Sequence, residues 1–187
     1  MKLSLKIFIL IVCTLILNTT RSFAEEEIPP EIYQWVQSTA RANYYFNKQQ
    51  MNYRVDKDGY IDLNILNVPT LCTYDGIQIQ DVIQKRRWRN KSTKNYQYLV
   101  GKADYLQFNF EKNTVTVTRH EDLDYAWGVL DVEENREPVN LDDIADGSVE
   151  KRFYNAILKY AEQHQQELIE RSTGKLTKAA QKILNKK

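Results

Sequence analysis

The sequence predicts an α+β protein built from an antiparallel sheet of about five to six strands, an N-terminal helix and a long C-terminal helix. Apolar residues recur at helical spacing near both ends, over residues 31–50 and again from Ser148 onward. Between these segments, short runs alternate apolar and polar residues and are separated by Asp, Asn and Gly, which is typical of β-hairpins. Helices on either side of a series of strands favour an α+β sandwich, in which the helices cover one face of the sheet.

The chain opens with the pattern of a cleavable export signal. A basic start precedes eleven uncharged residues, 7–17, a run too short to span a bilayer comfortably. Ser22 and Ala24 place small residues where a signal peptidase requires them, so we expect cleavage after residues 1–24. The mature protein would then be secreted, periplasmic or on the cell surface, with no transmembrane segment.

Removal of the signal would leave one domain of near-neutral charge. Cleavage takes away three of the 26 basic residues and none of the 25 acidic ones, which gives a net charge of −2. We expect residues 25–171 to form a single α+β domain and residues 172–187 a basic amphipathic tail. Cys72 would be the one cysteine left, which excludes an intramolecular disulfide. Its apolar neighbours favour a buried structural thiol.

The first half of the mature chain is expected to contain a helix and a hairpin. Two prolines precede a helical repeat of apolar residues, so we predict a helix over residues 31–50. Residues 53–55 and 60–66 are rich in β-forming side chains and flank an Asp-Gly turn, which predicts a hairpin. Residues 70–94 fit either a strand or a short helix, and we favour the strand.

The second half begins with the clearest hairpin of the chain. It pairs residues 105–110 with residues 114–118, and each run has its apolar side chains on one face. We also expect a strand at residues 96–100 and another at residues 125–132, with Gly128 as a bulge.

Capping residues mark the helices near the C-terminus. Asn140 is followed closely by two acidic residues, as at the start of a short helix. Ser148 suits the start of the long helix, whose apolar stripe ends at Gly174. Beyond it, residues 176–184 repeat the helical spacing on a segment without acidic residues.

Two groups of side chains are candidate binding residues. Six basic residues surround Trp88 between positions 85 and 94, a density that suits the phosphate, sulfate or carboxylate groups of an anionic ligand. The alternative is a solvated edge whose charges prevent aggregation. The ligand-binding candidates are Arg86, Arg87, Trp88 and Arg89, with Tyr125 and Trp127 as an aromatic surface.

Acidic residues are concentrated in the stretch 121–150, which contains eleven of them against a single base, Arg136. Three interpretations stay open: the stretch complements the basic segment within the fold, binds divalent cations weakly, or faces a basic partner. Solvated loops and helix starts are the simpler explanation.

The C-terminal tail is a third candidate surface. Its lysines lie on a weakly amphipathic segment that would suit an anionic lipid or another acidic envelope surface. These tail candidates are Lys175, Lys178, Lys182, Lys186 and Lys187. Alternatively, the apolar face of the same segment, with Leu176, Ile183 and Leu184, packs against the domain, or the segment frays as a chain terminus.

Linear motifs for catalysis, metals and cofactors are absent from the sequence. Residues 56–62 resemble the middle of an EF-hand loop, but Arg54 and Ile65 occupy the two main ligand positions. The two histidines, His120 and His164, form no His-Glu-x-x-His motif, and there is no Gly-x-Ser-x-Gly elbow. We therefore assign no catalytic, metal or cofactor-binding residue.

The favoured function is a small exported binding or interaction module of the bacterial cell envelope. Its partner is unknown, with an anionic ligand or an envelope surface as candidates; the export signal and the near-neutral charge disfavour nucleic acid. One alternative is a small envelope hydrolase with paired carboxylates, for which two acids beside Trp or Tyr in a pocket would be the sign. Another is a peripheral membrane-surface protein attached by its basic tail. No cofactor is expected.

Overall fold

An eight-stranded sheet with four helices makes up the part of the chain that the computed structural model describes, residues 28–185. The strands are β1 (Tyr33–Ser38), β2 (Ala42–Asn47), β3 (Asn52–Val55), β4 (Ile61–Tyr74), β5 (Leu99–Asn109), β6 (Thr114–Asp124), β7 (Val129–Glu134) and β8 (Val139–Asn140). The helices are α2 (Gly76–Trp88), α3 (Val149–Gln163), α4 (Gln165–Arg171) and α5 (Lys178–Leu184). The predicted signal peptide, residues 1–24, lies outside the described residues.

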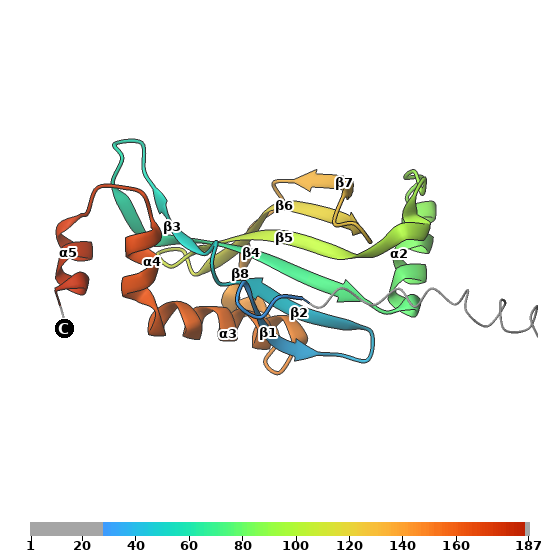
Figure 1. Cartoon of the computed structure of the whole chain (residues 1–187), viewed down its shortest axis with the longest axis horizontal. Coiled ribbons are helices and arrows are strands. Elements are labelled where there is room, and N and C mark those ends of the chain that lie inside the picture. The colour runs from blue at the N-terminus through green and yellow to red at the C-terminus, as the bar shows by residue number, and fades with distance from the viewer. Residues whose placement is uncertain (1–27, 186–187) are drawn as a thin grey trace, which may run out of the picture.

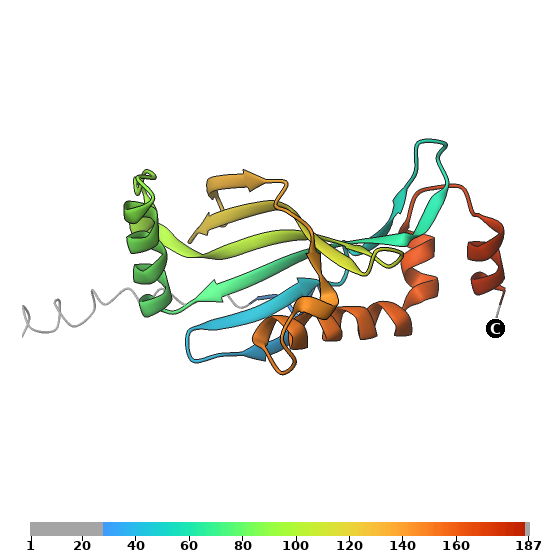
Figure 2. The same cartoon turned by 180° about the vertical axis from the view of Figure 1, so that it is seen from behind.

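Antiparallel pairing joins the strands in the order β1-β2-β4-β5-β6-β7, while β3 pairs with β4 and β8 pairs with β6. The central strands β4 and β5 run side by side from Ile65 opposite Asn109 to Thr73 opposite Gly101. Helix α3 lies along one face of the sheet, and α4 and α5 lie at one end of it (Figures 1 and 2). Helix α2 lies at the opposite end, so the molecule is elongated along its central strands.

The predicted N-terminal helix over residues 31–50 is wrong, because this segment forms the hairpin of β1 and β2. Its turn is closed by Thr39, whose backbone N–H donates to the Ala42 carbonyl at 2.8 Å. Aromatic side chains favour a strand over a helix here, because alternate residues of β2 pack on α3. The ring centroids of Tyr44 and Phe153, for example, are 5.7 Å apart. Two added strands are one reason why the sheet is larger than the five to six strands expected.

The preference for a strand over residues 70–94 is wrong beyond Tyr74, where β4 ends and α2 follows. Asp75 caps this helix, because its carboxylate accepts the backbone N–H of Gln78 at 2.7 Å. The strand expected at 125–132 is displaced to β7, and Gly128 lies in the preceding turn instead of a bulge. There its N–H donates to the carboxylate of Asp124 at 2.8 Å.

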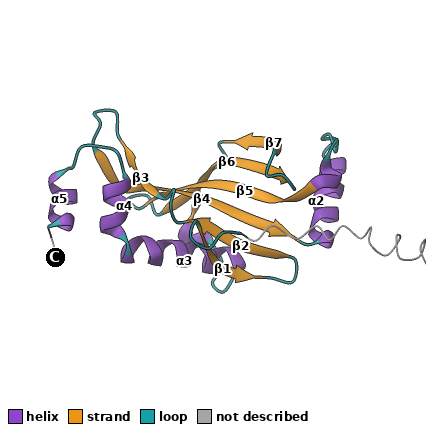
Figure 3. Ribbon diagram, viewed as in Figure 1, coloured by secondary structure: helices purple, strands orange, loops and turns teal. Residues whose placement is uncertain are grey.

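The two hairpins predicted from local patterns are confirmed by the pairings of β3 with β4 and of β5 with β6. The helix start at Ser148 is also confirmed, since its hydroxyl accepts the Lys151 N–H at 3.0 Å. The prediction of a single long C-terminal helix is wrong, because the chain bends at His164, which separates α3 from α4. The helices are therefore four shorter segments at the ends and on one face of the sheet (Figure 3).

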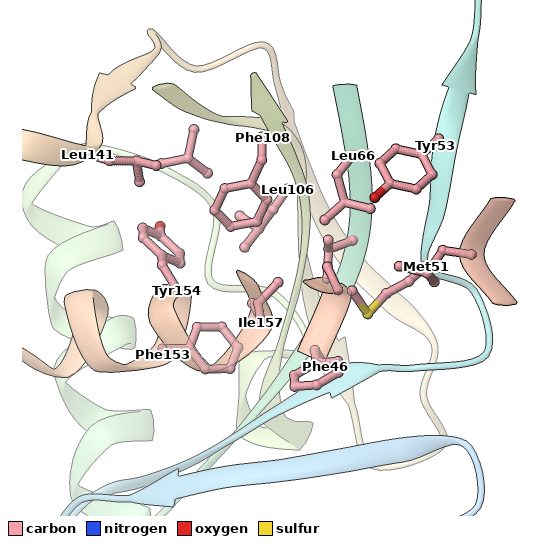
Figure 4. Close-up of a cluster of buried hydrophobic side chains, with 14 of the residues drawn as sticks. Phe46, Met51, Tyr53, Leu66, Leu106, Phe108, Leu141, Phe153, Tyr154 and Ile157 are labelled. Carbon is pink, nitrogen blue, oxygen red and sulfur yellow. The ribbon is translucent and has the colours of Figure 1, made fainter. Parts of the chain in front are cut away.

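The main core lies between the sheet and α3, on the half of the sheet nearer α4 (Figure 4). Ile157 of α3 and Leu66 and Phe108 of the central strands are fully buried there. Ala180 of α5 is also fully buried, with Ile183 and Leu184 packed beside it, so the apolar side of the tail belongs to this core. Burial of this apolar surface is the main source of stability, as expected for a chain without a disulfide among its described residues.

Gly101 occupies a position in β5 that no other residue fits. A Cβ atom there would lie 2.1 Å from the carbonyl oxygen of Cys72 in β4. Gly101→Ala should therefore lower the free energy of unfolding by about 2–3 kcal/mol, measured by urea denaturation, because two central strands must separate. Gly76→Ala is the matched control, since a Cβ atom at Gly76 meets nothing within 4 Å. Equal stability of the two variants would contradict this account of the strand contact.

Candidate binding site

A pocket of about 250 Å³ opens between the sheet and the first turns of α3. Strand alternation builds its floor: Lys102 pairs with Cys72, and Asp104 pairs with Thr70, so all four side chains share the face that α3 covers. Its polar wall consists of side chains from four elements, Tyr44, Cys72, Lys102, Asp104, Glu150 and Tyr154. Leu106 and Phe153 add apolar surface on the side of the core. The pocket therefore combines charged, hydroxyl and apolar groups.

An ion pair between Lys102 and Asp104 forms the charged part of the pocket floor, with 2.6 Å between Nζ and Oδ2. Burial alone would lower the pKa of Lys102, but the charge and hydrogen bond of Asp104 outweigh it and raise that pKa. The ammonium is therefore charged at neutral pH. It has three donors, and its side chain is 27% exposed, so donors are left for a ligand in the pocket.

His120 lies between two carboxylates behind this ion pair. Its Nδ1 is 2.6 Å from Asp104 Oδ1, and its Nε2 is 3.4 Å from Asp122 Oδ1. Burial opposes the charge on the imidazole, but the hydrogen bonds to Asp104 and Asp122 raise its pKa above 6.5. Asp104 responds in the opposite direction: burial disfavours its ionised form, yet hydrogen bonds from His120 and Lys102 lower its pKa to about 2.

The row of charges continues from Asp122 to α2. Tyr96 donates its hydroxyl to Asp122 Oδ2 at 2.7 Å, and Arg86 Nη1 lies 3.5 Å from the same oxygen. Arg86 also pairs with Asp131 at 2.7 Å and stacks over the Tyr96 ring, 4.1 Å from its centroid. The basic and acidic segments of the sequence therefore meet within the fold, a possibility that the sequence left open. Lys91 and Glu133 form a second such pair.

The residues predicted from the basic segment separate into two groups. Arg86 turns inward into the charged row, whereas Arg87, Trp88 and Arg89 are exposed at the end of α2. Trp88 is 76% exposed, the highest value among the exposed large hydrophobic residues. None of these four residues lines the 250 Å³ pocket.

The two aromatic candidates, Tyr125 and Trp127, lie in the turn between β6 and β7. Tyr125 packs edge-on against Tyr98, with 5.5 Å between their ring centroids. Trp127 lines a larger hollow of about 540 Å³, together with Tyr105, on the opposite face of the sheet from Lys102. We prefer the smaller pocket as the candidate site, because an ion pair and several hydroxyls converge there.

The tail lysines lie at the other end of the molecule. The backbone of Lys175 joins the β3–β4 turn, donating to the Gly59 carbonyl at 2.7 Å, and its Nζ lies 5.3 Å from the centroid of the Tyr60 ring. Lys178 and Lys182 are exposed on α5. Lys186 and Lys187 lie outside the described residues.

The pocket residues Tyr44, Lys102, Glu150 and Tyr154 are not among the candidates that the sequence suggested. One signal pointed to Lys102: in β5 the inward positions 106 and 108 are apolar, whereas 102 and 104 on the same face are charged. Charged residues on the inward face of a strand predict partners within the fold or a site. Tyr44 and Glu150 gave no such signal, because only the folded chain brings them to the pocket.

No protein-family model, curated protein or solved structure matches the chain. Function is therefore inferred from the pocket and its surroundings. Among residues 28–185, no group of His, Cys, Asp and Glu side chains is arranged to hold a metal ion, and no helix is long and apolar enough to cross a membrane. Burial raises the pKa of Cys72 to about 12, so at neutral pH this thiol is protonated and a poor nucleophile.

The charged row makes stability depend on pH through His120. Because its pKa is raised by folding, the protonated ring stabilises the protein fully below about pH 6.5. This contribution is lost as the pH rises through the raised value. We expect the free energy of unfolding, measured by urea denaturation between pH 5.5 and 8.5, to fall with pH in the unmodified protein and less steeply in His120→Gln. Parallel curves would show that His120 is not charged between Asp104 and Asp122.

Proposed function

We propose that this protein is exported and binds a small polar molecule in the pocket between the sheet and α3. The observation that carries the proposal is Lys102, a pocket-lining residue whose side chain is 27% exposed and whose ammonium Asp104 holds in place on the pocket floor. A buried ion pair costs desolvation energy and adds little stability, so a partly accessible one in a pocket favours a role in binding. The export signal predicted from residues 1–24 supports a location in the periplasm or at the cell surface.

The pocket's chemistry favours a small carboxylate that also carries hydroxyl or amino groups. Lys102 offers donors to an anionic group, and burial raises the pKa of Tyr44, so its phenol remains a donor. Glu150 lies on the other side and accepts the Tyr154 hydroxyl at 2.9 Å, which leaves further acceptor capacity. At about 250 Å³, the pocket falls just below the range of roughly 300–1,000 Å³ common for larger ligands. Sugar acids and amino acids have suitable size and groups.

The hydrolase alternative meets one of its conditions, since Asp104 and Glu150 both line a pocket with Tyr44 and Tyr154. Asp104 suits neither role of such a pair. Hydrogen bonds from His120 and Lys102 lower its pKa to about 2, so it has no proton to donate near neutral pH, and the same two residues occupy both of its oxygens, which leaves neither oxygen free to attack a substrate. Binding without chemistry is the function that this arrangement favours.

Thermal denaturation with defined probes tests the proposal. We expect glucuronate, galacturonate or an L-amino acid to raise the Tm of residues 25–187 by about 5–10 °C at roughly 100 times its Kd. Lys102→Met should remove the shift, because the anionic group loses its cation. Glu150→Gln should raise the Kd of the probe tenfold or more, although the glutamine still offers an acceptor to the Tyr154 hydroxyl.

Lys112→Met is the matched control, because Lys112 is an exposed lysine in the turn between β5 and β6. It should keep the full ligand-induced shift. The proposal fails if none of these probes stabilises the protein, or if Lys102→Met responds to them as strongly as the unmodified chain.

A further inference from the structure

Helix α2 has an outward side that combines apolar and cationic residues. Ile77, Gln84 and Trp88 are spaced at i, i+7 and i+11, so they share one side of the helix, and all three are exposed. Ile77 is 57% and Trp88 76% exposed, although two large apolar side chains in water cost hydration free energy. The opposite side of α2 packs on the sheet through Ile83, which is buried with Tyr96 and Leu99.

Cations flank this outward side and are not neutralised by the protein. Among the described residues, Lys85, Arg87 and Arg89 form no ion pair, whereas their neighbour Arg86 pairs inward with Asp122 and Asp131. The acidic residue within this helix, Asp81, is paired with Arg41 at 2.6 Å. The outward side of α2 is therefore a positively charged surface with a protruding indole.

We infer that the outward side of α2 docks on an anionic lipid surface. Indole rings favour the level of the lipid headgroups, where their apolar part and N–H are both satisfied. Lysine and arginine beside the ring would pair with lipid phosphates, each adding to the attraction toward a negative membrane surface. Trp88 would enter the headgroup layer, with Lys85 and Arg87 on its two flanks.

A single-stranded nucleic acid presents the same phosphates together with bases for stacking on Trp88. The predicted export signal and the exposure of Ile77 on the same side favour lipid, because an aliphatic side chain adds affinity for a membrane and none for a base. Lipid is therefore the partner to which the inference commits, and nucleic acid is an outcome of the test.

The second cationic end of the molecule supplies a matched control. The exposed tail lysines Lys175, Lys178 and Lys182 lie at and near α5, at the end of the sheet remote from α2 (Figures 1 and 2). Ala180, Ile183 and Leu184 beside them are packed in the core, whereas Leu176 is 37% exposed. Two triple variants, one at each end, remove the same number of positive charges from exposed positions.

Co-sedimentation with vesicles tests the inference on residues 25–187, since the described strands, helices and core all lie within 28–185. The vesicles contain equal parts of phosphatidylglycerol and phosphatidylcholine, with pure phosphatidylcholine as the uncharged reference. We expect salt-sensitive binding to the anionic vesicles alone. The variant Lys85→Gln, Arg87→Gln, Arg89→Gln should bind at least tenfold more weakly, and the variant Lys175→Gln, Lys178→Gln, Lys182→Gln within about twofold of the unmodified chain.

Tryptophan fluorescence gives an independent measurement. Anionic vesicles should shift the emission of the unmodified chain to shorter wavelength, and Trp88→Phe should abolish the shift, although Trp35 and Trp127 remain. The inference is overturned by any of four results: no vesicle binding at low salt, equal losses in the two triple variants, a loss confined to the tail variant, or tighter binding to a single-stranded oligonucleotide than to the vesicles.

Discussion

The long antiparallel pair of β4 and β5 is the constraint on which the rest of the structure depends. Its alternation places Leu66 and Phe108 on the same face as Cys72 and Lys102, so one continuous face is apolar at one end and polar at the other. Helix α3 covers both parts: Ile157 packs on the apolar half, and Glu150 borders the polar half. Core and candidate site are therefore two halves of a single sheet face.

The polar half holds a row of mostly buried charged side chains, which proteins rarely bury unless they are paired. Asp104, His120 and Asp122 each have partners on both sides, while Lys102 at one end pairs with Asp104 and Arg86 at the other end pairs with Asp122 and Asp131. Among the described residues, no buried side-chain nitrogen or oxygen lacks a hydrogen bond, so the desolvation cost is offset. Such a row adds little net stability, because desolvation offsets its attraction, yet removing one member would be costly, since its neighbours would keep an unpaired buried charge.

Local signals were sufficient for part of the fold. The hairpin of β5 and β6 and the cap at Ser148 depend on residues a few positions apart, and both were predicted. The hairpin of β1 and β2 was predicted as a helix, because the apolar residues of segment 31–50 happen to recur at helical spacing. Their real partners lie far along the chain, where Tyr44 pairs with Cys72 in β4. The pocket was missed for the same reason, since its walls come from β2, β4, β5 and α3.

Helix α2 links the candidate pocket to the inferred docking surface through neighbouring residues. Successive residues of a helix point about 100° apart, so Arg86 can face the sheet while Arg87 and Trp88 face outward. Arg86 is the last member of the charged row that begins at Lys102 in the pocket. A helix held by that row presents its outer cations from a fixed position, so the basic cluster around Trp88 would serve two purposes. Its inward member, Arg86, pairs with Asp122 and Asp131, and its outward members would contact the lipid surface that we infer.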